Sequence, residues 1–170
     1  YRDPKNVLDE IGLLVDRYGM ENIKISDEMF VLNEKHVTDI CSGIIERGYH
    51  LNIWAYARVD TVKGRMLPLL KKAGINWLAL GIESGSRHVR DGAAKRFGQD
   101  DIRNAVRAIQ DAGIYVIGNY IFGLPADTTE TMRETLDLAM ELNCEFANFY
   151  AAMAYPGSAL YRQAIAENWR

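Results

Sequence analysis

The sequence WLALGIESGS, at residues 77–86, constrains what this 170-residue chain can fold into more than any other segment. Its opening residues are almost all apolar, which is typical of a parallel strand covered on both faces by helices. Glu83 follows directly, and a carboxylate avoids the apolar interior only at the C-terminal end of such a strand, where α/β folds bind ligands. Gly85 and Ser86 then permit a tight turn into a helix.

The same strand–helix layout is predicted along the whole chain. Apolar spacing predicts strands at residues 23–25, 51–56, 77–83, 115–122 and 146–153, and helices at 4–18, 34–47, 65–72, 87–91, 101–111, 129–142 and from 159. Asp3, Asp100 and Asn143 are the expected caps of three of these helices. Helical connections imply parallel neighbouring strands, so we predict one α/β domain over residues 1–170, either a barrel or an open doubly wound sheet.

Composition narrows the class of protein. The net charge of −3 argues against a general nucleic-acid binder, and no apolar run approaches the ~20 residues that span a bilayer. Two distant cysteines, Cys41 and Cys144, make neither a metal motif nor a disulfide framework, which favours a cytoplasmic setting. The chain opens with a polar segment that has no initiator Met and no signal peptide, so we expect a fragment or a processed start. Because the first predicted element is a helix, we also expect that the first strand is missing.

Charged and small residues follow the predicted strands, and in a parallel sheet they would meet at one rim. They are Asp27, Glu28, Arg58, Asp60, Glu83, Ser84, Gly123 and Tyr155. Carboxylates together with an arginine indicate a site for a polar, partly cationic small molecule, and the alternative is a solvated, charge-balanced rim. An ordinary barrel enzyme that uses these carboxylates for acid–base or Mg²⁺ chemistry, or a non-catalytic scaffold, would have the same rim.

Asn119 interrupts an otherwise apolar strand, and a buried amide without a hydrogen bond costs ~1–3 kcal/mol. It is either a core residue bonded to a neighbouring strand or an amide that binds a ligand hydroxyl inside the barrel. Lys95 and Arg96 are either a solvated basic turn or a clamp for a ligand carboxylate. We interpret Trp54 and Trp77 as core residues.

The ordered strand ends resemble those of the radical S-adenosylmethionine enzymes. The matching segments are ISDEMF (25–30), WAYARVD (54–60), LGIESGS (80–86), IFGLPADTTET (121–131) and YPGSALY (155–161). They are most similar to a subgroup that often carries an upstream cobalamin-binding domain and includes methyltransferases and anaerobic magnesium-protoporphyrin cyclases. The resemblance implies a partial (βα)6 TIM-like barrel whose first strand lies outside this chain. It also implies a [4Fe–4S] cluster, S-adenosylmethionine and, in members of the subgroup, cobalamin.

The resemblance assigns cofactor-binding roles to individual residues. Asp27 and Glu28 match the segment near the methionine amino group, and Glu83, with the adjacent Ser84, matches the polar position that contacts the methionine moiety or the ribose. Further positions are Lys95 or Arg96 for the methionine carboxylate, Asn119 for the ribose hydroxyls, and Ile121, Met153 and Tyr155 near the adenine.

The departure from the family pattern concerns the cluster. The family binds its [4Fe–4S] cluster through CxxxCxxC, and the chain has no such motif. We therefore expect the cluster ligands to lie outside this chain and the chain alone to be inactive. The parent protein would bind an unidentified substrate, draw electrons from a reductant such as flavodoxin or ferredoxin, and self-associate through the open edge of the barrel.

Overall fold

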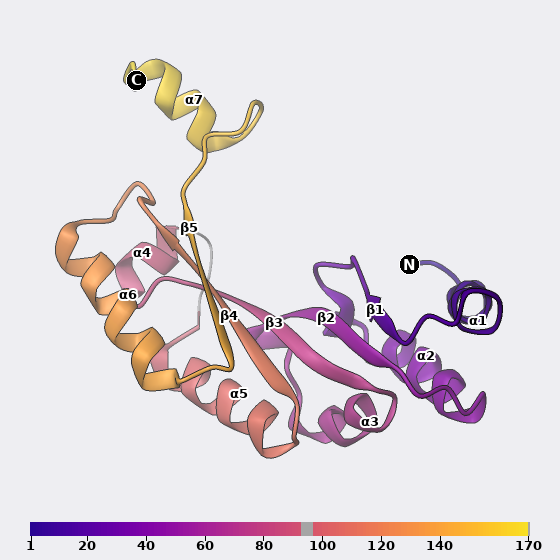
Figure 1. Ribbon diagram of the computed structural model, residues 1–170. Helices are drawn as coiled ribbons and strands as arrows, with labels where there is room; N and C mark the ends of the chain where they lie inside the picture. The colour runs from indigo at the N-terminus through magenta and orange to yellow at the C-terminus, as the bar shows by residue number, and fades with distance from the viewer. Residues whose placement is uncertain (93–96, 170) are drawn as a thin grey trace.

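The computed structural model describes residues 1–92 and 97–169, and it contains a parallel five-stranded sheet that curls into a half-barrel (Figure 1). The strands pair in chain order: β1 (Asn22–Lys24), β2 (Asn52–Arg58), β3 (Ile75–Glu83), β4 (Tyr115–Phe122) and β5 (Phe146–Ala151). The helices are α1 (Pro4–Gly12), α2 (Glu34–Glu46), α3 (Leu67–Lys72), α4 (Arg87–Gly92), α5 (Gln99–Asp111), α6 (Thr129–Leu142) and α7 (Ala159–Ala166). The predicted α/β partial barrel is therefore confirmed.

Several predicted boundaries are wrong. β2 ends at Arg58 rather than at residue 56, and β3 begins at Ile75 rather than at residue 77. The helix predicted at 101–111 with Asp100 as its cap is α5, which begins at Gln99 after Gly98. The reason is that the Asp101 carboxylate accepts a hydrogen bond from the Gly98 N–H (2.8 Å), while Asp100 pairs with Arg103 inside the helix. β5 ends at Ala151 rather than at residue 153.

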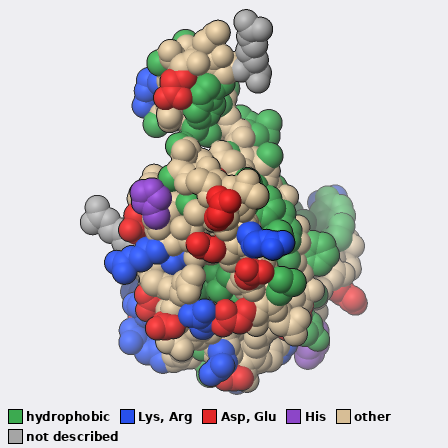
Figure 2. All heavy atoms as spheres, turned by 90° about the vertical axis from the view of Figure 1, so that its left-hand side faces the viewer, with side chains coloured by type: hydrophobic (Ala, Val, Ile, Leu, Met, Phe, Trp, Pro, Cys, Tyr) green, Lys and Arg blue, Asp and Glu red, His purple; other side chains and the backbone are tan. Residues whose placement is uncertain are grey.

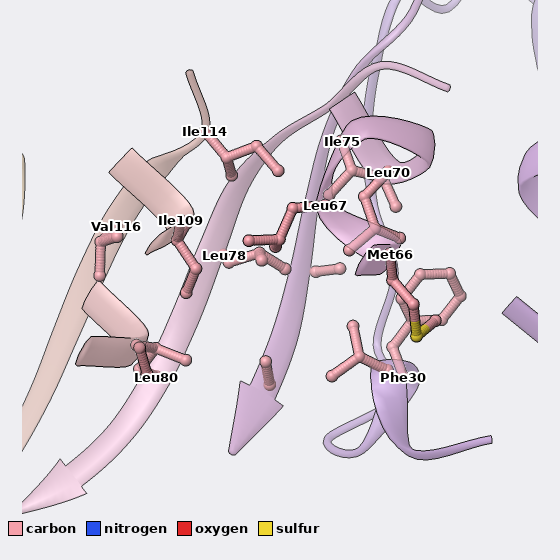
Figure 3. Close-up of a cluster of buried hydrophobic side chains, with 14 of the residues drawn as sticks. Phe30, Met66, Leu67, Leu70, Ile75, Leu78, Leu80, Ile109, Ile114 and Val116 are labelled. Carbon is pink, nitrogen blue, oxygen red and sulfur yellow. The ribbon is translucent and has the colours of Figure 1, made fainter. Parts of the chain in front are cut away.

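The main hydrophobic core lies between the outer face of the sheet and the helices. Leu78, Leu80 and Ile82 of β3 alternate toward this face and are fully buried. They pack with α3, α5 and the short helical turns Phe30–Leu32 and Gly64–Met66, and Figure 3 shows the cluster that these elements form. Because alternate residues of a strand point to the same face, one apolar face of each strand packs against the helices.

Within residues 1–92 and 97–169, the inner face of the half-barrel has no such helical layer. Helices α2, α3, α5 and α6 all lie on the outer side in Figure 1, whereas Trp54, Tyr56 and Trp77 on the inner face stay partly exposed. The expectation that β3 is covered by helices on both faces is therefore wrong. Ala79, on the inner side of β3, is nevertheless only 1% exposed.

The outer helical surface carries mixed charges, which Figure 2 shows over the face that includes α6. Arg103 of α5 bonds Glu141 of α6 (2.6 Å), so opposite charges join neighbouring helices. Within the described ranges, no helix has the length and apolar character needed to cross a membrane.

Candidate functional site

A cavity of about 360 Å³ lies where the sequence predicts a site, at the C-terminal ends of the strands. Its volume falls within the range of about 300 to 1,000 Å³ that small-molecule sites usually occupy. Residues from β1 to β4 contribute, so the parallel order of the strands is what assembles it. We call it the rim cavity, and its lining includes Lys24, Ser26, Glu28, Tyr56, Arg58, Glu83 and Asn119.

Glu83 reaches the rim cavity because the backbone turns sharply at the end of β3. Its φ of 69° lies in the left-handed region, and the pairing of β3 with β4 shifts register between Gly81 and Glu83. A non-glycine residue held in this region costs ~1–3 kcal/mol and is frequent at functional sites. Asn119 of β4 pairs with Gly81 of β3. The register shift after Gly81 brings Glu83 into the same cavity as Asn119.

Arg58 brings positive charge to the same cavity. Its Nε and Nη2 donate to the two carboxylate oxygens of Asp60, each at 2.9 Å. This pairing raises the pKa of Arg58, and the negative charge of Glu83 adds to the rise. The cavity therefore combines acidic and basic groups, as a zwitterionic ligand requires.

The turn after Glu83 is anchored from outside the cavity. The Ser84 side chain is fully buried and shares a hydrogen bond of 3.1 Å with Thr135 of α6. Thr135 also accepts from the Gly85 N–H (2.9 Å), and the buried Arg90 donates to the carbonyls of Ser84 and Gly85 (2.7 and 2.9 Å). The Ser84 hydroxyl thus joins β3 to α6 and does not line the rim cavity, in contrast to its predicted role in cofactor binding.

Asn119 both bonds a neighbouring strand and lines the rim cavity, so the structure is compatible with each of the two roles expected for it. Its Oδ1 accepts a hydrogen bond from Asn148 on β5 (3.0 Å), which satisfies the amide oxygen across the strands. The same side chain lines the rim cavity, and the described residues provide no acceptor for its NH2 group. Asn119 is therefore fixed in orientation by the sheet while its donors remain available to a ligand.

The predicted pair Asp27 and Glu28 separates. Asp27 accepts a hydrogen bond from the Met29 N–H (2.9 Å) and so stabilises the turn that follows β1. Glu28 is exposed and lines the rim cavity. Glu28 and Glu83 share the rim cavity, whereas Asp60 bonds Arg58 and Asp27 closes a turn. Among the described residues the four rim carboxylates therefore do not meet at one point, which argues against a Mg²⁺ site formed by all four.

None of the three predicted adenine-contacting residues is in the lining of the rim cavity. Ile121 is partly buried and, two residues beyond Asn119 on β4, shares its face of the sheet. Met153 and Tyr155 are 61% and 64% exposed, on the segment that leads away toward α7 (Figure 1). Lys95 and Arg96 lie outside the described residues.

Lys24 and Tyr56 belong to the site and were missed. Lys24 lies over two rings, with its Nζ 4.1 Å from the centroid of Trp54 and 5.3 Å from that of Tyr56. Alternation along β2 places Trp54, Tyr56 and Arg58 on one face, so this signal was present in the sequence. Trp54 and Trp77 were interpreted as core residues, but both are only partly buried on the inner face.

The cysteines have no geometry for a cluster. Cys41 is inaccessible on α2, and burial raises the pKa of its thiol to about 12. Burial also raises the pKa of Cys144 to about 11. In the described ranges, no three His, Cys, Asp or Glu side chains come together in a way that could hold a metal ion. The residues present fit an organic zwitterion in the rim cavity and do not fit an iron–sulfur cluster.

Comparison with known proteins gives the family. The model of the radical SAM superfamily matches residues 1–139. An uncharacterised methyltransferase of Pyrococcus horikoshii is 30% identical over 96% of the chain and 36% of its own length. The anaerobic magnesium-protoporphyrin IX monomethyl ester cyclase of Rubrivivax gelatinosus is 29% identical over 95% of the chain and 30% of its own length. The chain thus spans about a third of these relatives.

Solved structures share the fold. The radical S-adenosylmethionine methyltransferase TsrM of Kitasatospora setae superposes with a TM-score of 0.80 at 22% identity, over 88% of this chain and 29% of its own. Coproporphyrinogen III oxidase of Escherichia coli gives 0.74 at 16% identity, over 94% of this chain and 40% of its own. Both carry radical S-adenosylmethionine chemistry on a fold of this kind. On the match over residues 1–139, the chain belongs to the radical SAM superfamily of enzymes, whose members use a [4Fe–4S] cluster and S-adenosylmethionine.

Proposed function

We propose that this chain binds S-adenosylmethionine in the rim cavity, as the central part of a methyltransferase or cyclase of the radical SAM superfamily. The observation that carries the proposal is that Glu83 and Asn119, from different strands, line one cavity at the C-terminal rim. A carboxylate and an amide donor there match the amino and hydroxyl groups of S-adenosylmethionine.

The chain's own residues would bind and orient the ligand. Glu28 and Glu83 would accept hydrogen bonds from the methionine amino group or the ribose, and the Asn119 NH2 group would donate to a ribose hydroxyl. Ile121 would then contact the adenine on the same face. Lys95 or Arg96 would hold the methionine carboxylate. When bound beside a reduced [4Fe–4S] cluster, S-adenosylmethionine supplies a 5′-deoxyadenosyl radical.

The iron–sulfur cluster, any cobalamin and the electron donor would belong to the complete enzyme. We propose that the cluster ligands lie outside this chain, because its two cysteines are far apart and buried or partly buried. The TsrM structure contains cobalamin, which supports cobalamin as a cofactor of the complete enzyme as well. A flavodoxin or ferredoxin in the cytoplasm would provide the electron, and the edges of β1 and β5 would favour self-association.

The test is made on the full-length enzyme, purified without oxygen. Glu83→Gln and Asn119→Ala should each raise the Kd for S-adenosylmethionine about ten- to a hundredfold. Glu83→Gln removes the negative charge that strengthens the hydrogen bond to the ammonium group, and Asn119→Ala removes the amide donors to the ribose. Formation of 5′-deoxyadenosine should fall in parallel, while iron content stays unchanged.

The matched controls are Glu134→Gln and Asn6→Ala, which make the same changes at exposed helical positions. Both should leave affinity and cleavage at the wild-type level. Wild-type affinity in Glu83→Gln and Asn119→Ala would show that the ligand binds elsewhere and would overturn the proposal.

A further inference from the structure

A second cavity adjoins the rim cavity on the inner face of the half-barrel. It measures about 650 Å³ and lies nearer the starts of the strands. We call it the inner hollow, and its lining is dominated by the side chains of Trp54, Trp77, Ile117, Phe146 and Tyr150. Lys24 lines both cavities, so a ligand in the inner hollow would lie directly beside a ligand in the rim cavity.

The rings of the inner hollow are open to solvent. Phe146 and Tyr150 of β5 are 57% and 51% exposed, and helices α2, α3, α5 and α6 lie on the other face of the sheet (Figure 1). Rings gathered around one concavity are unusual on a solvated surface and mark a binding site. Their flat faces favour a planar aromatic partner, which gains stacking or edge-to-face contacts beyond simple burial.

The polar groups of the inner hollow are engaged with one another, with one exception. Asn52 donates to Asn22 (2.8 Å), and Asn148 donates to Asn119 (3.0 Å). The lining contains no carboxylate. Lys24 forms no hydrogen bond or ion pair with another residue in 1–92 or 97–169, and its ammonium group lies over the Trp54 ring. The inner hollow is therefore positively charged and lacks a counter-ion among these residues.

We infer that the inner hollow binds a planar aromatic ligand that carries an anionic group, with the anion at Lys24 and the ring among Trp54, Trp77 and Tyr150. The inference rests on the proposed function, since the ligand would be the substrate class of the enzyme. The shared Lys24 places such a ligand next to S-adenosylmethionine, which is where a hydrogen donor or methyl acceptor must lie.

The probe is 2-naphthoate, a planar aromatic carboxylate, titrated into the full-length enzyme by calorimetry. Two analogues each lack one feature: decahydro-2-naphthoate has no aromatic ring, and 2-naphthalenemethanol has no charge. The wild-type enzyme should prefer 2-naphthoate to the saturated acid by about three- to tenfold, because aromatic contacts add to burial. It should also prefer 2-naphthoate to the alcohol about tenfold, through the ion pair.

Two variants remove one feature of the site at a time. Lys24→Met should weaken 2-naphthoate about tenfold and leave 2-naphthalenemethanol unchanged, whereas Lys63→Met, at an exposed lysine outside the inner hollow, should alter neither. Trp54→Leu keeps an apolar side chain and should reduce the preference for 2-naphthoate over the saturated acid, because it removes one of the rings that contact the ligand. The ratio of the affinities for 2-naphthoate and 2-naphthalenemethanol, and that for 2-naphthoate and the saturated acid, do not change when part of the protein is unfolded.

Equal binding of 2-naphthoate and its saturated analogue, or wild-type affinity in Lys24→Met, would overturn the inference. The inference would also be overturned if 2-naphthoate does not bind and the fluorescence of Trp54 and Trp77 is protected from quenching by acrylamide. Another part of the enzyme would then fill the inner hollow. Titration with S-adenosylmethionine in the same samples separates the two proposals. If S-adenosylmethionine binds and 2-naphthoate does not, only the substrate class is wrong.

Discussion

At the scale of single residues, function and stability make opposite demands on Glu83. Its left-handed backbone costs free energy that a glycine would not, yet a glycine at this position would supply no carboxylate to the rim cavity. The neighbouring residues oppose the strain: Thr135 bonds Ser84 and Gly85, and Arg90 bonds their carbonyls. Glu83 is thus held in a strained conformation by residues that do not line the cavity.

Cys41 shows the opposite behaviour, a reactive group made inert by burial. Since burial raises its thiol pKa to about 12 from 9.0, the unfolded chain loses this proton between pH 9 and 12 while the native chain keeps it. The free energy of unfolding should therefore fall as pH rises through this interval, and Cys41→Val should remove part of that fall. Urea titrations at pH 7, 9 and 10 measure the effect.

A second measurement of the same residue uses a thiol reagent at pH 8. Cys41 in the folded protein should react at least ~100-fold more slowly than in urea, because the thiolate is the reactive species. Cys144→Ala isolates the Cys41 signal. Rapid labelling of the folded protein would contradict the buried position of Cys41.

At the scale of elements, the contact between the end of β3 and α6 determines the position of the site. A Cβ on Gly85 would lie 2.3 Å from the carbonyl oxygen of Glu134, so the turn and the helix approach as closely as a glycine permits. Thr135, fully buried on the same helix, supplies the hydroxyl that bonds this turn. The identity of residue 85 is therefore set by packing against α6 as well as by turn geometry.

Gly85→Ala should destabilise the protein by ~3 kcal/mol or more, since the clash is with backbone and no side chain can move aside. Affinity for S-adenosylmethionine should fall with it, because Glu83 would shift. Gly64→Ala is the control, as its Cβ would have no atom within 4 Å. Chemical denaturation of the two variants gives the comparison, and equal stability would show that α6 can move away freely.

At the scale of the whole molecule, the half-barrel is well packed on its outer face and incomplete elsewhere. None of the residues of α7 is buried, and it stands apart from the sheet in Figure 1. Phe149 on β5 is 42% exposed, although its ring stacks on Tyr120 with centroids 5.0 Å apart. The C-terminal part of the chain therefore contributes little to the core that holds the rim cavity.

Deletion of residues 159–170 should change the thermal midpoint of this chain by less than ~2 °C, because no buried apolar surface is lost. Deletion from residue 144 onward should lower it by several degrees, since it also removes β5 and its pairing with β4. Circular dichroism melting curves of the three chains provide the test. A large loss on the shorter deletion would mean that α7 packs on the sheet in solution.

Much of the fold follows from the sequence because local rules act on neighbouring residues. Asp3 caps α1 through its side chain and Asn143 ends α6 in the left-handed conformation, both as predicted, and period-two alternation defines the strands. The position of Glu83 at the end of an apolar strand could likewise be predicted from the sequence. The family resemblance then predicted that Glu83 and Asn119 serve one ligand, and the structure brings them to one cavity.

The tertiary structure alone determined which side chains point into the rim cavity and which elements contact one another. Ser84 was predicted to bind cofactor, but α6 approaches so closely that its hydroxyl bonds Thr135. Lys24 carries no local signal of a role, and it enters the site because β1 pairs with β2 in a register that places it opposite Trp54. Strand periodicity determines which residues share a face, whereas the curvature of the sheet and the packing of helices determine which faces enclose a cavity.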